Sequence, residues 1–142
     1  MGGIIMATYK EAFVSYLEKE KLKYEDIDER ALRMSWNVGN IASGLEILVI
    51  FDKENRNAVH FMSSGFCKVP EDKIDTMLRA CNEANERYRW FKFYIDKKRD
   101  IYAEADAILD MANVSEECIE LVARMVNIVD DVYPTFMKVI YA

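Results

Sequence analysis

The chain has 142 residues, enough for one domain with a substantial core, and we expect residues 1–142 to form a single domain. Hydrophobic residues make up 51% of the chain and charged residues 31%, which is typical of a globular protein and excludes a disordered one. A net charge of −6 argues against nucleic acid as a partner, and no apolar run approaches the roughly 20 residues of a membrane helix.

The N-terminal segment, MGGIIMATYKEAF, has neither the basic stretch nor the apolar stretch of a secretory signal, so we expect a cytoplasmic protein. The three cysteines, Cys67, Cys81 and Cys118, are widely spaced and odd in number. We therefore expect free thiols in a reducing compartment. No CxxC pair is present, and we predict no zinc site.

A first helix is predicted from Thr8. Thr8 and Glu11 have the spacing of a capping box, in which each side chain accepts a hydrogen bond from the other residue's backbone amide. Apolar residues then recur at helical spacing until the helix ends near residues 20–22. The polar run 25–30 is either a loop or a short strand.

Three strands follow. Residues 31–38 alternate between apolar and polar, which indicates a half-buried strand, and Gly39-Asn40 is a turn signal. The segment 45–52 is apolar on both faces over its middle, so we expect it at the centre of the sheet. Residues 53–57 are predicted to be a hairpin loop that leads into a third strand at 58–66.

The second helix is predicted to begin at Pro70, whose fixed φ suits the first helical position. Asn85 lies on the apolar stripe of this helix. A buried amide needs partners, so we expect its side chain to bond the backbone of an adjoining strand or loop. The stripe itself comprises Ile74, Met77, Leu78, Cys81, Ala84 and Tyr88.

A hairpin is predicted directly after Arg87. The alternation places Phe91, Phe93 and Ile95 on the core side of its first strand and Trp90, Lys92, Tyr94 and Asp96 on the other side. A charged turn at 97–99 leads to a second strand at 101–109. The alanines on the core side of that strand leave room for a helix to approach closely.

The last helix is predicted to start with Ser115 as its N-cap and to run towards Tyr141. Its apolar surface is wider than one sheet face would cover. We therefore predict a homodimer whose contact is either this helix, through Val126, Val129, Tyr133 and Met137, or the outer face of the sheet. Pro134 is expected to kink the helix or to split it in two.

These elements follow the order α-β-β-β-α-β-β-α, which indicates an α+β domain with an antiparallel sheet and packed helices. The order, together with residues 80–85, 87–96 and 100–105, resembles the YbjN family of bacterial domains. The resemblance implies a type III secretion chaperone-like fold in a cytosolic, homodimeric and non-enzymatic domain. Chaperones of that fold bind extended segments of a protein client.

The residues of the chain do not suggest catalysis. The single histidine, His60, lies in mid-strand, and no cysteine is placed to meet it. The acidic residues Asp96, Asp100, Glu104 and Asp106 fit a solvated strand end better than a metal site. We predict no catalytic residue, no metal and no cofactor.

The sheet face opposite the core is too apolar to be fully solvated, because it is predicted to present Leu48, Ile50, Met62, Trp90, Tyr94 and Tyr102. Either a helix covers this face, or it contacts another chain. Our hypothesis is a protein-binding module, chaperone-like or regulatory, that binds its partner through Met62, Trp90, Tyr94 and Tyr102. The alternative is a small-molecule sensor whose ligand lies against the three aromatic residues.

Overall fold

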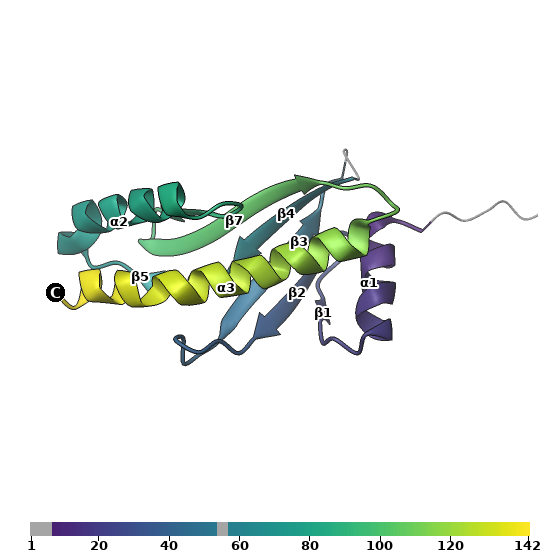
Figure 1. The fold of residues 1–142 in the computed structure, drawn as a ribbon, viewed down its shortest axis with the longest axis horizontal. Helices are drawn as coiled ribbons and strands as arrows, with labels where there is room; N and C mark the ends of the chain where they lie inside the picture. Colours follow the sequence, from purple (N-terminus) through teal and green to yellow (C-terminus); the bar gives the residue numbers. More distant parts are fainter. Residues whose placement is uncertain (1–6, 54–56) are drawn as a thin grey trace, which may run out of the picture.

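The computed structural model describes residues 7–53 and 57–142, which form one antiparallel sheet packed against three α-helices (Figure 1). The α+β class and the predicted order of the main elements are confirmed; the run 25–30 contains a short strand at Glu25–Asp26, one of its two predicted alternatives, and a short strand at Cys67–Lys68 is added. The elements are α1 (Tyr9–Lys19), β1 (Glu25–Asp26), β2 (Ala31–Trp36), β3 (Leu45–Phe51), β4 (Ala58–Ser63), β5 (Cys67–Lys68), a 3₁₀ turn η1 (Glu71–Lys73), α2 (Ile74–Arg87), β6 (Lys92–Ile95), β7 (Asp100–Ile108) and α3 (Val114–Ile140).

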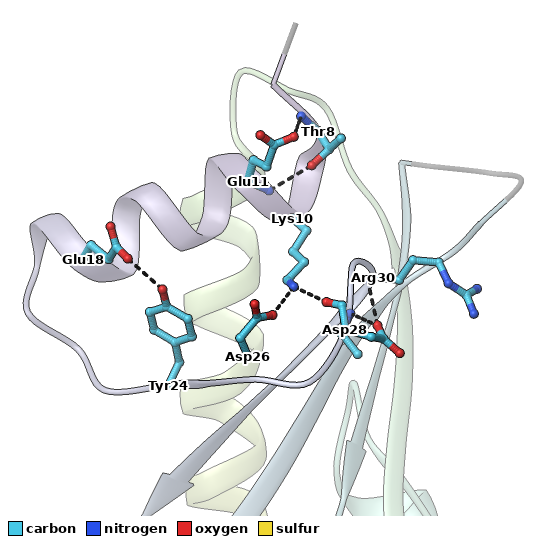
Figure 2. A network of polar contacts seen from close by, with 9 residues as sticks. Thr8, Lys10, Glu11, Glu18, Tyr24, Asp26, Asp28 and Arg30 are labelled. Atoms are coloured by element: carbon cyan, nitrogen blue, oxygen red, sulfur yellow. Dashed lines mark hydrogen bonds and ion pairs between the residues drawn. The ribbon is translucent and has the colours of Figure 1, made fainter.

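The first helix begins as predicted. The Glu11 backbone N–H donates to the Thr8 hydroxyl (3.0 Å), and the Thr8 N–H donates to the Glu11 carboxylate (3.1 Å), as Figure 2 shows. The two hydrogen bonds satisfy amides that an α-helix leaves unpaired at its start. Phe13 and Leu17 are buried on the apolar face of the helix, which ends at Lys19.

The strands follow the order β1-β2-β3-β4-β7, and β3 lies between β2 and β4 as predicted. β7 pairs with three strands. Residues 104–108 pair with β4, residues 100–101 pair with β5, and residues 101–104 pair with β6. Because Glu104 pairs with both Met62 and Lys92, β4 and β6 lie on opposite sides of β7.

The core lies between one face of the sheet and the helices. In Figure 1, α3 runs along the sheet, with α1 beside its N-terminal half and α2 beside its C-terminal half. The largest buried side chains come from all layers, including Phe13 of α1, Phe61 of β4 and Phe136 of α3. The Phe93 and Phe136 rings meet edge to face with centroids 5.4 Å apart, which fixes α3 over β6.

The start of α3 differs from the prediction, because its N-cap is Asn113 and not Ser115. Val114 is buried, and its packing sets the first helical residue. Ser115 therefore lies inside the helix, where its hydroxyl donates to the Ala12 carbonyl (3.4 Å). The Asn113 side chain accepts instead from the Asp110 N–H (3.2 Å) in the preceding turn.

Pro134 does not split α3, which continues from Val114 to Ile140. Proline has no N–H to donate to the carbonyl four residues earlier, which belongs to Asp130. That carbonyl accepts from the Asn40 side chain instead (2.9 Å), and the Asn40 N–H donates to the Asp130 carboxylate (2.7 Å). The Gly39-Asn40 turn thus replaces the hydrogen bond that the proline removes.

The start of α2, the burial of Leu78 and the end of the preceding strand also differ from the predictions. Pro70 precedes the η1 turn, and α2 itself begins at Ile74. Leu78 is 50% exposed, because the buried face of α2 consists of Met77, Ala80, Cys81 and Ala84. The third predicted strand, 58–66, ends earlier, as β4 at Ser63, and β5 begins only at Cys67, beyond the predicted end. Part of the predicted loop 53–57 lies outside the described residues.

Candidate functional site

The face of the sheet that points away from the core is defined by the strand register. Leu48 pairs with Met62, Ile50 pairs with His60, and Tyr94 pairs with Tyr102. Side chains at these positions are half-buried or exposed, whereas their neighbours along each strand are mostly buried against the helices. This alternation indicates that no helix of the described residues covers the face. We call Leu48, Ile50, Met62, Tyr94 and Tyr102 the outer patch.

The two tyrosines of the outer patch hold each other in place. Their rings stack with centroids 5.7 Å apart and an interplanar angle of 21°, and the Tyr94 hydroxyl donates to the Glu104 carboxylate (2.8 Å). Desolvation is the larger cause, and this hydrogen bond the next, of the rise in the pKa of Tyr94 to about 12. Desolvation also raises the pKa of Tyr102. Both phenols are therefore neutral at physiological pH, and they offer a flat aromatic surface beside Met62.

A polar network borders the outer patch on β4 and β7. The Nδ1 atom of His60 lies 2.8 Å from the Asp106 carboxylate, and its Nε2 atom lies 3.6 Å from the Glu104 carboxylate. Glu104 also accepts from Tyr94. These contacts link the only histidine to two carboxylates, of which Glu104 is the cross-strand neighbour of Met62 and lies within the outer patch.

The network lacks a nucleophile. Cys67, Cys81 and Cys118 are buried, and burial raises the pKa of their thiols to about 12, about 11 and about 12, respectively. A protonated thiol is a poor nucleophile. His60 lies on the opposite face of the sheet from the core, so it does not form a Cys-His pair with any of them. Within residues 7–53 and 57–142, no three acidic, His or Cys side chains are placed to hold a metal ion.

Trp90 does not belong to the outer patch, contrary to the prediction. β6 begins only at Lys92, so the alternation of that strand does not extend back to Trp90. Trp90 has a positive φ of 81°, and its ring lies 5.3 Å from the guanidinium of Arg124 on α3. The indole is 54% exposed and lies where the chain passes from α2 to the sheet.

The residues predicted for a dimer interface on α3 are only partly accessible. Val129 is completely buried and packs the core of its own chain. Val126, Tyr133 and Met137 are half-buried. The Tyr133 ring lies 6.5 Å from that of Phe66, so this tyrosine also contributes to internal packing.

Two grooves were not predicted from the sequence. One, of about 690 Å³, lies between α1 and the strand ends and includes Lys10 and Arg30. Figure 2 shows Lys10, a buried cation, donating to the Asp26 carboxylate and the Asp28 carbonyl. These hydrogen bonds connect α1 to β1 and to the segment that follows it. In the sequence, only the acidic run at 25–30 indicated a partner for this lysine.

The second groove, of about 550 Å³, lies on the outer face at one end of the strands. Ile50 and His60 line it on β3 and β4, and Asp106 and Ile108 line it on β7. The groove extends the outer patch towards the end of β7. Ile108 is 84% exposed, which is unusual for a large aliphatic residue in a strand.

Comparison with known proteins gives a family and a fold. The model of the YbjN family, described as a putative bacterial sensory transduction regulator, matches residues 14–138. A chain in the crystal structure of the ExsC-ExsE complex superposes with a TM-score of 0.53 at 18% sequence identity, over 90% of this chain and 92% of that chain. The predicted type III secretion chaperone-like fold is thereby confirmed. No curated protein matches the chain. In the described ranges, no helix has both the length and the apolar composition needed to cross a bilayer.

Proposed function

This chain belongs to the YbjN family, and from that premise we propose that it is a non-enzymatic, cytoplasmic module that binds another protein chain through its outer patch. The single observation that carries the proposal is the apolar centre of an uncovered sheet face. Along a strand with one solvated face, polar residues on the solvent side normally alternate with apolar residues on the buried side. Here Leu48, Met62 and Ile50 occupy the solvent side of the two central strands.

The composition of the outer patch supports a protein partner. Aromatic residues and methionine are enriched in protein interfaces, and charged residues are depleted at their centres. Tyr94 and Tyr102 are rigid, neutral and half-buried or exposed, so little side-chain freedom would be lost on binding. Glu104 lies within the patch, between Met62 and Lys92 across the strands, where it accepts a hydrogen bond from Tyr94, and Asp106 lies beside His60 at its border.

We also propose that the chain forms a homodimer through the accessible flank of α3. Val126 and Tyr133 are seven residues apart and therefore lie on the same side of the helix, and Met137 follows one turn later. Their partial exposure on a 27-residue helix supports this contact. Val129 is not part of the proposed surface, because it is buried in the core.

Two double variants separate these proposals. Leu48→Ser/Met62→Ser changes the outer patch, and Val126→Ser/Tyr133→Ser changes the flank of α3. Light scattering on wild type at micromolar concentration should give the mass of a dimer, and the α3 variant should shift it towards the monomer. A monomeric wild type would contradict the dimer.

The partner is tested by pull-down from cells that naturally produce the protein, after circular dichroism has shown that each variant is folded. A partner recovered with wild type and with the α3 variant, but lost with the outer-patch variant, is the expected result. Equal recovery of the same partner by wild type and both variants would refute the outer patch as the binding surface.

A small-molecule sensor is the second candidate, and the 550 Å³ groove beside the outer patch favours it. A ligand that binds only the folded state raises the melting temperature. A metabolite panel in a thermal-shift assay therefore tests this candidate. A shift that is lost in Ile50→Ser would support it, and the absence of any shift across a broad panel would count against it.

A further inference from the structure

A strained turn between α2 and β6 holds a tryptophan on the surface. The Phe91 N–H donates to the Arg89 carbonyl (3.0 Å), and Trp90, which lies between them, has a φ of 81°. This is the rare, strained form of the γ-turn, and a positive φ is unfavourable for a bulky residue. Phe91 is completely buried, whereas the Trp90 indole is 54% exposed. Such strain concentrates at functional sites, so the turn is a candidate binding feature.

Cationic groups lie beside the Trp90 indole. The guanidinium of Arg124, on α3, lies 5.3 Å from the centroid of the indole, and it forms an ion pair with Glu120 (2.9 Å). Arg89 precedes Trp90 in the turn, and its side chain is exposed. Within residues 7–53 and 57–142, no carboxylate forms an ion pair with Arg89. We call Arg89, Trp90 and Arg124 the Trp90 corner.

The charge near the Trp90 corner has the opposite sign to that of the whole chain. Residues 86–99 contain six basic and two acidic residues, although the chain carries a net charge of −6. Two carboxylates of α3 that lie near the corner already have partners. Glu120 pairs with Arg124, and Asp131 accepts a hydrogen bond from the Tyr88 hydroxyl. The corner therefore presents guanidinium groups to an incoming anion.

These features favour a protein segment over other anionic ligands. Neither of the two grooves described above includes a residue of the Trp90 corner, which suits a macromolecule better than an enclosed small molecule. Single-stranded nucleic acid also stacks on aromatic side chains, but every added phosphate is repelled by a chain that is acidic overall. A protein segment brings only a few carboxylates, and tryptophan and arginine are the residues that contribute most to protein interfaces.

We propose that the Trp90 corner binds an acidic segment of a partner protein. Carboxylates of the segment accept hydrogen bonds from the guanidinium groups of Arg89 and Arg124, which can form two parallel bonds with one carboxylate. An apolar side chain between these carboxylates covers the exposed part of the Trp90 ring. The corner includes a residue of α3, which packs on the other face of the sheet from the outer patch. The inference therefore goes beyond the proposed function and adds a second contact surface.

The test follows tryptophan emission of the full chain during titration with a short peptide in which glutamates flank a single phenylalanine. The peptide should change the emission of wild type until it saturates. Trp36 is the only other tryptophan, so Trp90→Asn, which should abolish the change, assigns the signal to Trp90. Asparagine is suitable because it tolerates a positive φ. The same peptide with lysines in place of the glutamates should have no effect.

Reversal of one charge provides a second, independent variant. Arg89→Glu should weaken binding of the glutamate peptide about tenfold or more, because it removes charge-assisted hydrogen bonds. Arg79→Glu is the matched control, since Arg79 is an exposed arginine on α2 outside the corner, and it should weaken binding about twofold or less. If Trp90→Asn does not fold, the comparison of the two arginine variants still provides the test.

Four results would overturn the inference. They are the absence of a saturable change with the glutamate peptide, equal weakening by Arg89→Glu and Arg79→Glu, a change of emission with protein concentration alone, and tighter binding of single-stranded oligothymidylate than of the peptide. The third result would identify the occupant as a second copy, and the fourth as a nucleic acid. The proposed function is judged separately, by the Leu48→Ser/Met62→Ser pull-down, so the Trp90 corner can fail while the outer patch stands.

Discussion

Replacing Asn85 with alanine should destabilise the protein more than any other polar substitution in α2. The Asn85 side chain forms two hydrogen bonds to the backbone of Phe93, at 2.7 and 3.1 Å, and both are partly buried. Alanine would remove both bonds and would leave an N–H and a C=O of β6 without a partner. The substitution therefore acts on the closed edge of the sheet, at β6.

The expected magnitude follows from these two bonds. A hydrogen bond contributes about 1 kcal/mol net, and an unsatisfied buried group costs about 1–3 kcal/mol. Phe93 is buried, but its two hydrogen bonds to Asn85 are only partly buried. We therefore expect a loss of about 2–3 kcal/mol in the free energy of unfolding. For a chain of this length, that corresponds to a fall in melting temperature of about 5–10 °C.

Urea denaturation followed by circular dichroism would measure the loss, with Asn82→Ala as the matched control. Asn82 is an exposed asparagine on the same helix, and its replacement should change stability by less than about 0.5 kcal/mol. Amide exchange at Phe93 should also accelerate in the Asn85 variant. Equal stability of the Asn82 and Asn85 variants would refute the role that we assign to Asn85.

Three further predictions concern other contacts. Thr8→Ala removes the capping box with Glu11 and should cost about 1 kcal/mol in urea denaturation; an unchanged midpoint would contradict it. Asn40→Ala leaves the Asp130 carbonyl unpaired beside Pro134 and should cost about 1–2 kcal/mol, with faster exchange in the C-terminal half of α3; unchanged stability and exchange would argue against that role. The pKa of Tyr94 is raised from 10.0 to about 12, so its contribution to stability is present below pH 10 and is lost as the pH rises towards 12. Wild type should therefore lose stability more steeply than Tyr94→Phe between these pH values, and parallel curves would contradict the raised pKa.

Local periodicity was enough to predict most of the fold. The alternation in 31–38 and 45–52 predicted β2 and β3 and their buried faces, because strand side chains alternate whatever their partners are. Asn85 was predicted to bond an adjoining strand because it is a polar residue on an apolar stripe, and its bonds to Phe93 confirm this.

The errors arise where a pattern was extended beyond the element that produced it. Trp90 was assigned to the outer face because the alternation of β6 was continued backwards through a connection that has a positive φ. Ser115 was assigned as the N-cap because its type fits, but the burial of Val114 decides where α3 begins. Pro134 was expected to kink or split the last helix, and the split does not occur, because a turn 90 residues away in sequence bonds the freed carbonyl.

The groove beside Ile108 could not be found from the sequence, because its lining comes from three strands, β3, β4 and β7, that are far apart along the chain. The outer patch was predicted in part. Met62, Tyr94 and Tyr102 lie on the expected face, because each is inside a regular strand.

The central claim is that the outer patch contacts another protein chain. Its most direct test is a photo-reactive amino acid at position 62, in the middle of the patch, irradiated in cells that naturally produce the protein. The same amino acid at position 83, where Glu83 is exposed on α2, serves as the control. We predict a cross-linked adduct with a discrete polypeptide from position 62 and none from position 83. No adduct at position 62, or the same adduct from both positions, would contradict the account.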